Sequence, residues 1–353
     1  MPNDVIVSIS SRSTTKIQSL DTVEVFSLQM RLLHMLLHLP RLIRRSSTLR
    51  LHSSSSNTVR ELYREGMSLL KESNISEPEE STRYLLLDVL QKGYRLSTLL
   101  ANMDQPLTSS QTALFYSHLQ RRLRSEPVQY ILGNWDFFGL TFLCKAPVLI
   151  PRPETEELVE AILDRGVLSN ARETFVLDVG AGTGVIGIAL LSRLSQAKCL
   201  AIDINPLAVD LSRENALRIL GSESRRYQCQ DISFNELAAR KDYRHKFDII
   251  VSNPPYIPTE EMESLQTDVK DFEDERALCG GAEGLDIVLQ IIHGARALLV
   301  PEGPREIWME VSPRHPNMIR SLLEQSGGPK VELLEIIEDL SGKQRFVRLR
   351  CKD

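Results

Sequence analysis

Short apolar runs alternate with amphipathic stretches over the last two thirds of the chain. Runs such as 174–178 and 247–252 have the length of buried strands, and the stretches between the runs repeat apolar residues at helical spacing. This alternation predicts an α/β domain. Strands are expected at 174–178, 199–202, 227–231, 247–252, 305–311, 331–337 and 345–350, and helices at 185–194, 285–299 and 316–325. The last two strands are expected to form the antiparallel edge of a seven-stranded sheet.

The preceding part of the chain shows helical stretches separated by breaks. Residues 58–61 read Thr-Val-Arg-Glu, the pattern of a capping box at the start of a helix. Further helices are expected at 81–90 and 109–123. The chain therefore divides into a leader at 1–56, a small helical domain at 57–125, a linker with a β-hairpin at 136–144 inside 126–150, and the α/β domain at 151–353.

A glycine-rich turn follows the first strand of the α/β domain and opens a helix. Glycines in such a turn let the backbone approach a ligand closely, and a helix start presents free N–H groups. The spacing is not the GxGxxG of dinucleotide-binding proteins. The candidate ligand-binding residues of this turn are Gly180, Ala181, Gly182, Thr183 and Gly184.

Two acidic residues end the next two predicted strands. Asp203 follows strand 199–202, at the place where a carboxylate meets the ribose hydroxyls of a nucleoside ligand in an open α/β sheet. Asp231 ends strand 227–231 and is a candidate acceptor for an adenine amino group. Both acids also have an alternative interpretation, since Asp203 precedes Asn205-Pro206 and can cap the following helix.

The segment Asn253-Pro254-Pro255-Tyr256 follows the strand at 247–252. An asparagine side chain both accepts and donates hydrogen bonds, and prolines fix the backbone while leaving carbonyls with no neighbouring N–H. These features suit a site that reads an NH2 group on a planar nitrogen. A plain turn at the end of a strand is the alternative, and Tyr256 either walls the pocket or packs in the core.

Together these motifs resemble a class I S-adenosylmethionine-dependent methyltransferase, a Rossmann-like fold, rather than a dehydrogenase. The segments Arg124-Ser125-Glu126-Pro127-Val128-Gln129-Tyr130-Ile131-Leu132-Gly133 and Pro151-Arg152-Pro153-Glu154-Thr155-Glu156 narrow the resemblance. With Asn-Pro-Pro-Tyr downstream, the chain from about residue 60 onward is similar to the N5-glutamine methyltransferases of peptide chain release factors, the HemK/PrmC-like family.

The resemblance implies methylation of the side-chain amide of the glutamine in a Gly-Gly-Gln loop. It also implies that residues 180–184 and Asp203 hold the cofactor, that Asn253, Pro254, Pro255 and Tyr256 hold the glutamine, and that the helical domain helps grip the release factor. A domain that only packs is the alternative for the helical part.

One departure from the family pattern lies at Asp274, where the family usually has a proline. The surrounding stretch 260–275 carries eight acidic residues against Lys270. We expect this stretch to be a solvated lid or surface loop, with direct substrate contact as the less favoured alternative.

An amide nitrogen is a weak nucleophile because its lone pair is delocalised into the carbonyl. The expected mechanism is therefore alignment of the amide with the methyl group. The Asn253 side-chain oxygen and the Pro254 carbonyl are expected to accept hydrogen bonds from the two amide N–H groups. The proton of the methylated nitrogen is lost late, so no general base is needed. Neither the histidines nor the five scattered cysteines show metal-ligand spacing, and no metal is expected.

The leader differs in composition from the rest of the chain. Residues 25–60 contain six arginines, a serine cluster and no acidic residue, a profile typical of a mitochondrial transit peptide. Met30 is a candidate alternative start, and a basic tail that stays attached is the other interpretation. Histidines, Pro40 and Arg41 interrupt the apolar run, so no membrane span is expected. The sequence therefore predicts a mitochondrial matrix enzyme that acts on a mitochondrial release factor.

Charge weighs against nucleic acid as the substrate. The whole chain has a formal net charge of −5. Residues 1–56 contain seven basic and three acidic residues, which leaves 35 basic against 44 acidic residues and a net charge of −9. Such a body is a poor general binder of phosphate backbones. An amino-methyltransferase acting on a nucleic-acid base and a non-catalytic scaffold remain the rival functions.

Overall fold

The computed structural model describes residues 57–168, 171–325 and 328–352. The predicted transit peptide at 1–56 and the alternative start at Met30 lie outside the described residues. From Ser56 onward the chain forms one compact unit.

Five helices form the first part of this unit. The capping box is confirmed, because the Thr58 hydroxyl accepts from the Glu61 N–H and the Glu61 carboxylate accepts from the Thr58 N–H. Buried apolar residues such as Leu62, Leu85 and Phe115 form the core of these helices. Two short helices, α4 and α6, were not expected. The helices are α2 (Val59–Glu72), α3 (Pro78–Leu90), α4 (Leu96–Ala101), α5 (Ser109–Arg122) and α6 (Val128–Leu132).

A two-stranded hairpin follows. Its strands, β1 (Asn134–Phe137) and β2 (Leu140–Leu143), pair antiparallel around the turn at Phe138-Gly139. Both residues of the turn have positive φ.

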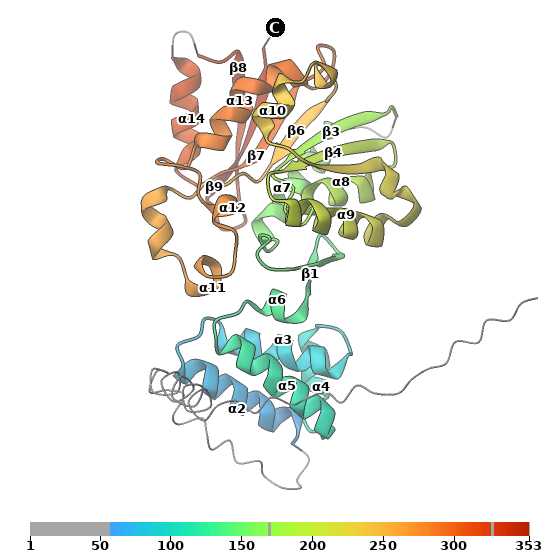
Figure 1. Cartoon of the computed structure of the whole chain (residues 1–353), viewed down its shortest axis with the longest axis vertical. Helices are drawn as coiled ribbons and strands as arrows, with labels where there is room; N and C mark the ends of the chain where they lie inside the picture. The colour runs from blue at the N-terminus through green and yellow to red at the C-terminus, as the bar shows by residue number, and fades with distance from the viewer. Residues whose placement is uncertain (1–56, 169–170, 326–327, 353) are drawn as a thin grey trace, which may run out of the picture. The chain divides into compact units, whose positions relative to one another are not determined.

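The seven-stranded sheet has the expected antiparallel edge. Its order is β5-β4-β3-β6-β7-β9-β8 (Figure 1). Strands β5, β4, β3, β6 and β7 run parallel, and β9 pairs antiparallel with both β7 and β8. The strands are β3 (Thr174–Val179), β4 (Ala197–Asp203), β5 (Tyr227–Asp231), β6 (Ile249–Ser252), β7 (Glu306–Glu310), β8 (Val331–Glu338) and β9 (Gln344–Cys351).

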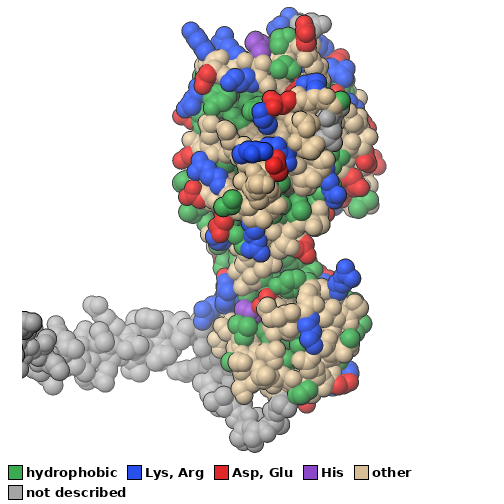
Figure 2. All heavy atoms as spheres, turned by 90° about the vertical axis from the view of Figure 1, so that its right-hand side faces the viewer, with side chains coloured by type: hydrophobic (Ala, Val, Ile, Leu, Met, Phe, Trp, Pro, Cys, Tyr) green, Lys and Arg blue, Asp and Glu red, His purple; other side chains and the backbone are tan. Residues whose placement is uncertain are grey.

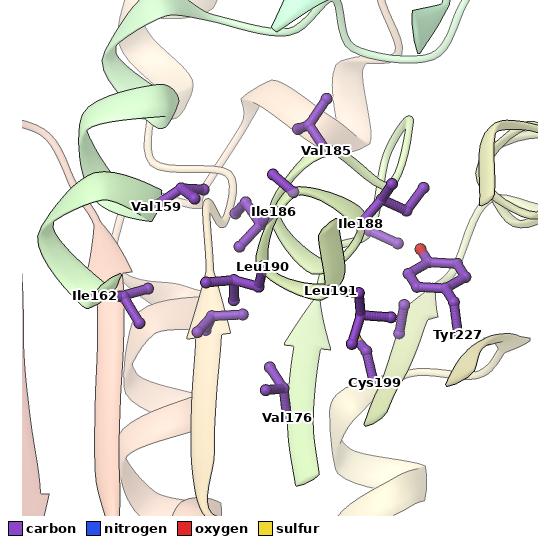
Figure 3. Close-up of a cluster of buried hydrophobic side chains, with 14 of the residues drawn as sticks. Val159, Ile162, Val176, Val185, Ile186, Ile188, Leu190, Leu191, Cys199 and Tyr227 are labelled. Carbon is purple, nitrogen blue, oxygen red and sulfur yellow. The ribbon is translucent and has the colours of Figure 1, made fainter. Parts of the chain in front are cut away.

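Helices cover both faces of the sheet. Alternate strand residues point to opposite faces, so Val176 packs into one apolar cluster with α7 and α8 while Leu177 packs into another with α10 and α13 (Figure 3 shows the first cluster). The longer helices are α7 (Pro153–Asp164), α8 (Val185–Arg193), α9 (Pro206–Leu220), α13 (Asp286–Leu298) and α14 (His315–Glu324), and α10 (Phe234–Ala239) has six residues. The short ones are η2 (Gly221–Arg226), η3 (Lys241–Tyr243), η4 (Thr259–Ser264), α11 (Thr267–Lys270) and α12 (Glu275–Leu278).

The acidic stretch at 260–275 is only partly the solvated loop that we expected. Glu260, Glu261 and three further acids are exposed. Glu273, by contrast, is buried and pairs with Arg152, and Asp268 pairs with Arg122 of the helical part. The expectation of a solvated loop was wrong for these two acids. Each of them pairs with a different arginine that lies more than 100 residues earlier in the chain.

The structure also describes the state of the cysteines and the length of the apolar helices. The cysteines are free thiols, and four of the five are buried. None of the helices in the described ranges is long and apolar enough to cross a membrane.

Candidate active site

The candidate site lies where the strand order reverses, at the carboxyl ends of β3, β4 and β6. From β3 the chain proceeds outward through β4 and β5, and it then returns to the other side of β3 with β6. Ligands of open α/β sheets bind at such a reversal. A cavity is found there, lined by Gly180, Gly182, Asp203, Ser233 and Asn253 among others. The volume of this cavity, including the part open to solvent, is about 830 Å³.

The glycine turn contributes two of its five residues to the wall of this cavity. Gly180 and Gly182 line it and have φ of +76° and +53°, a region that side chains with a Cβ rarely adopt. Ala181 and Thr183 are buried and are absent from the wall, and Gly184 is the N-cap of α8. The turn thus brings backbone rather than side chains to the ligand space.

A buried carboxylate lies beneath this turn. One oxygen of Asp178 accepts from the Gly187 N–H at 3.0 Å, and the other oxygen has no hydrogen-bond partner among the described residues. Burial raises the pKa of Asp178 to about 7. Asp178 therefore holds the start of α8 in place from inside the protein.

Asp203 is oriented by the backbone around it. Its two carboxylate oxygens accept from the Gly182 N–H at 2.9 Å and from the Asn205 N–H at 2.8 Å. Burial raises the pKa of Asp203, and these two hydrogen bonds oppose the shift. Asp203 is not the cap of the following helix. The cap of α9 is Asn205, whose side chain accepts from the Leu207 N–H. Asp203 keeps lone pairs for a ligand in the cavity.

Asp231 lies at the tip of β5 but is exposed and does not line the cavity. The next three residues, Ile232, Ser233 and Phe234, do line it. A contact between Asp231 and an adenine group stays a prediction.

A second cavity adjoins the first at the Asn-Pro-Pro-Tyr segment. Pro254 and Tyr256 line only the second cavity, and Pro255 lines only the first. Asn253 lines both, as do Leu149 and Ala277. Asn253 therefore stands in the wall that two ligands would share.

The Asn253 side chain is held by residues that sequence reasoning missed. Its Nδ2 donates to Thr155 Oγ1 at 3.0 Å, and Thr155 donates in turn to Glu310 at 2.7 Å. The Tyr256 hydroxyl donates to the other oxygen of Glu310 at 3.2 Å. Burial raises the pKa of Glu310 to about 7. The only signal for Glu310 in the sequence is an acid at the end of an apolar strand.

Two glycines allow another loop to pack against the Asn-Pro-Pro-Tyr backbone. A Cβ on Gly284, where φ is +74°, would lie 2.2 Å from the Tyr256 carbonyl oxygen. A Cβ on Gly280 would lie 2.5 Å from the Pro255 carbonyl oxygen. Both contacts are closer than any side chain permits, so these positions require glycine.

Arg152 and Glu273 brace the second cavity. One Arg152 nitrogen contacts both Glu273 carboxylate oxygens at 2.7 Å, and the Glu273 side chain is 1% exposed. Arg152 lines the cavity beside Tyr256. The sequence motif around Arg152 served as a family signature, and the structure gives it a physical role.

Asp274 has an ordered place in the wall of the first cavity. Its side chain caps α12 and accepts from Asn205 Nδ2 at 2.7 Å, and its N–H donates to the Pro147 carbonyl at 2.8 Å. The departure from proline therefore leaves a loop that three hydrogen bonds hold.

The second cavity presents acceptors to a substrate. Because Asn253 donates through Nδ2 to Thr155, its Oδ1 is left without a donor among the described residues. No described residue donates to the Pro254 carbonyl either. Two free acceptors beside a second ligand space are suited to bind the two protons of a primary amide.

The sheet order, the glycine turn, the strand-tip carboxylate and the paired cavities define a class I S-adenosylmethionine-dependent methyltransferase. Two family models match the chain, "PrmC N-terminal domain" at residues 61–133 and "Methyltransferase small domain" at residues 158–269. The chain belongs to the release factor glutamine methyltransferase family, as its relatives show.

Three relatives illustrate the match. The MTRF1L release factor glutamine methyltransferase of Homo sapiens is 36% identical over 302 residues, which cover 82% of this chain and 86% of the human protein. The release factor glutamine methyltransferase of Geobacter sulfurreducens is 36% identical and covers 70% and 82% of the two chains. That of Deinococcus radiodurans is 31% identical and covers 83% and 98%.

Proposed function

We propose that this protein transfers a methyl group from S-adenosylmethionine to the side-chain amide nitrogen (N5) of the glutamine in the Gly-Gly-Gln loop of a mitochondrial peptide chain release factor. The observation that carries the proposal is the position of Asn253 in the wall between two adjoining cavities. The first cavity suits a nucleoside, and the second offers two acceptors to an amide. Family membership supports a release factor as the protein substrate.

Each candidate residue receives a role in this proposal. Residues 180–184, Asp203 and Asp231 hold the cofactor together with Asn253, while residues 253–256 hold the glutamine. The helical domain at 57–125 contributes to recognition of the release factor.

Catalysis rests on alignment of the amide. Twisting it fully out of conjugation would cost roughly 18–20 kcal/mol, so the residues must work with a planar group. Asn253 Oδ1 and the Pro254 carbonyl accept hydrogen bonds from the two N–H groups of the amide. These hydrogen bonds direct the amide nitrogen toward the methyl carbon. Holding reactants in such a geometry contributes on the order of 7 to 11 kcal/mol. The bound sulfonium compound supplies the methyl group and its own leaving group.

The experiment that tests the function uses radiolabelled S-adenosylmethionine with two forms of a mitochondrial release factor. We expect label on the wild-type factor and none on a variant whose loop glutamine is replaced by alanine. Label on nucleic acid, or on neither form of the factor, would contradict the proposal.

The surface supports a protein rather than a nucleic-acid substrate. Basic and acidic side chains are interspersed over the face seen in Figure 2, without a continuous basic surface on that face. A base-modifying enzyme needs such a surface to bind phosphates.

We further propose that residues 1–56 direct the protein to the mitochondrial matrix. The support is their arginine-rich, acid-free composition from residue 25 onward. Fused to a fluorescent reporter, residues 1–56 should carry it into mitochondria. A reporter that stays in the cytosol would count against this part of the proposal.

A further inference from the structure

Two hydrogen bonds connect the Asn253 amide to a buried carboxylate, and a third reaches that carboxylate from Tyr256. Asn253 donates to Thr155, Thr155 donates to Glu310, and Tyr256 donates to Glu310 from the other side. Thr155 and Glu310 are 2% and 1% exposed. Thr155 lies in the first turn of α7, and Asn253 and Tyr256 lie in the loop after β6. Glu310 is the last residue of β7.

These hydrogen bonds have a direction, and the carboxylate sets it. An ionised carboxylate only accepts hydrogen bonds, so in the ionised form of Glu310 the hydroxyl protons of both Thr155 and Tyr256 point at it, as they do in the structure. The Thr155 oxygen then has lone pairs left but no proton for Asn253. If the Asn253 amide were flipped, its oxygen would face the Thr155 oxygen with no proton between them.

The orientation of Asn253 decides what the second cavity accepts. With Nδ2 on Thr155, the cavity receives Oδ1, which accepts a proton of an amide. In the flipped state the cavity would receive an NH2, which repels an amide NH2 and attracts a carboxylate. The same asparagine can therefore favour glutamine or glutamate, depending on what lies behind it.

We propose that Thr155 and Glu310 are positioning residues that fix the Asn253 amide with its oxygen toward the substrate, and that they thereby select a glutamine amide over a glutamate carboxylate. This inference rests on the proposed function and assigns roles to two residues outside the Asn-Pro-Pro-Tyr segment. Burial is essential to the device, because water would otherwise supply the missing protons and remove the preference for one orientation.

The groups around Glu310 are consistent with this role. Burial opposes the charged form of Glu310 most strongly and Glu154 of α7 opposes it as well, whereas Arg345 of β9 favours it. The hydrogen bonds from Thr155 and Tyr256 also favour the charged form. Arg345 is itself paired with Asp339 at 2.9 Å, which leaves the short contacts of Glu310 to the two hydroxyl groups.

A matched pair of variants tests the role of Thr155. Thr155→Val keeps the shape but removes the hydroxyl, whereas Thr155→Ser keeps the hydroxyl. We expect Thr155→Val to lower kcat for the release factor by about 10²-fold, as misplacement of a reacting group does. Thr155→Ser should restore kcat to within about threefold of wild type, and the Kd for S-adenosylmethionine should change little in both variants.

A second readout measures selectivity. A release factor with its loop glutamine replaced by glutamate should inhibit the wild-type enzyme weakly and the Thr155→Val enzyme more strongly, because Asn253 is then free to flip. Packing alone would not produce such a change in preference.

Glu310→Gln tests the carboxylate directly. Thr155 and Tyr256 donate to different oxygens of Glu310, and the amide places an NH2 where one of these oxygens stands. One hydroxyl then loses its acceptor, so kcat should fall by about tenfold or more. An unchanged kcat in this variant would overturn the role of Glu310.

The remaining outcomes separate the possible failures. If wild-type enzyme does not methylate the release factor, the proposed function fails before the variants are compared. If wild type is active and Thr155→Val is equally active, the inference fails alone. A loss of kcat in Thr155→Val that comes with matching losses of Tm and cofactor affinity would make Thr155 a structural residue and also overturn the inference.

Discussion

Asn253 lines both cavities. In the proposed function the first is the nucleoside cavity, which takes the cofactor, and the second is the amide cavity, which takes the substrate glutamine. A single side chain in the shared wall can contribute to cofactor binding, to substrate binding and to the geometry between them. Its separate contributions can be measured by substitution.

We expect Asn253→Ala to lower kcat by about 10² to 10³-fold, the range seen when one preorganised hydrogen-bonding group is removed from a reacting centre. Cofactor affinity should be largely retained, because Asp203 and the glycine turn remain. Equilibrium binding of S-adenosylmethionine and single-turnover methylation measure the two quantities. A large loss of cofactor affinity would show that the main role of Asn253 lies on the other side of the wall.

Asp203→Ala should have the opposite signature. The change removes acceptors for the Gly182 and Asn205 N–H groups and for the ligand, so Kd for S-adenosylmethionine should rise by about tenfold or more. At saturating cofactor, kcat should recover toward the wild-type value. The exposed Asp231 provides a comparison, and an equal effect of Asp231→Ala would show that it also contacts the cofactor.

The site residues divide into those that are visible in the sequence and those that depend on the fold. The glycine turn, Asp203 and Asn253 each stand at a strand end and are recognisable from a few neighbouring residues. Thr155 and Glu310 acquire their role through partners 98 and 155 residues away in the chain. No local pattern encodes such a pairing, which only packing of α7 against β7 creates.

At the level of elements, α7 is connected to the loop before α12 by the ion pair between Arg152 and Glu273. The carboxylate end of this pair is shielded from water, since the Glu273 side chain is 1% exposed, whereas the Arg152 side chain is 29% exposed. The pair holds Arg152 in its place in the wall of the second cavity.

Replacing only one partner of this pair should be strongly destabilising. Glu273→Leu leaves the Arg152 charge uncompensated, and such changes cost about 3 to 5 kcal/mol. The double variant Arg152→Met, Glu273→Leu should recover much of that loss. Denaturant unfolding measures both, with Glu214→Gln at the exposed Lys145–Glu214 pair as a control that should change little. A Glu273→Leu variant as stable as this control would contradict the prediction.

The elements themselves were predicted well where periodicity is strong. All seven strands and the three helices expected at 185–194, 285–299 and 316–325 are present, with ends displaced by at most two residues. The helices α4 and α6 were missed because six and five residues are too few to show a helical repeat. The longer helix α7 was also not predicted, since its first residues were interpreted only as a family motif. The acidic stretch was misjudged because burial of Glu273 depends on a distant arginine.

At the scale of the whole molecule, buried carboxylates couple stability to pH. The pKa of Asp178 is raised to about 7 in the folded protein, above its value in the unfolded chain. The folded state therefore binds the proton more tightly. The stability from this proton is fully present at low pH and is lost as pH rises through about 7.

We expect the free energy of unfolding to fall by roughly 2 kcal/mol between about pH 5 and about pH 7 because of Asp178. Asp178→Asn should flatten this part of the profile, whereas Asp210→Asn at an exposed position should not. Urea unfolding at several pH values measures the slope. A slope that is the same in Asp178→Asn and wild type would show that other groups cause it.

The two acceptors of the amide cavity have a consequence for the number of methyl groups added. A primary amide has two protons, one for Asn253 Oδ1 and one for the Pro254 carbonyl, but a methylated amide has only one. A second transfer would have to proceed with one acceptor unpaired and with the first methyl group in the place of a proton. The enzyme should therefore add a single methyl group to each glutamine, however long the reaction runs.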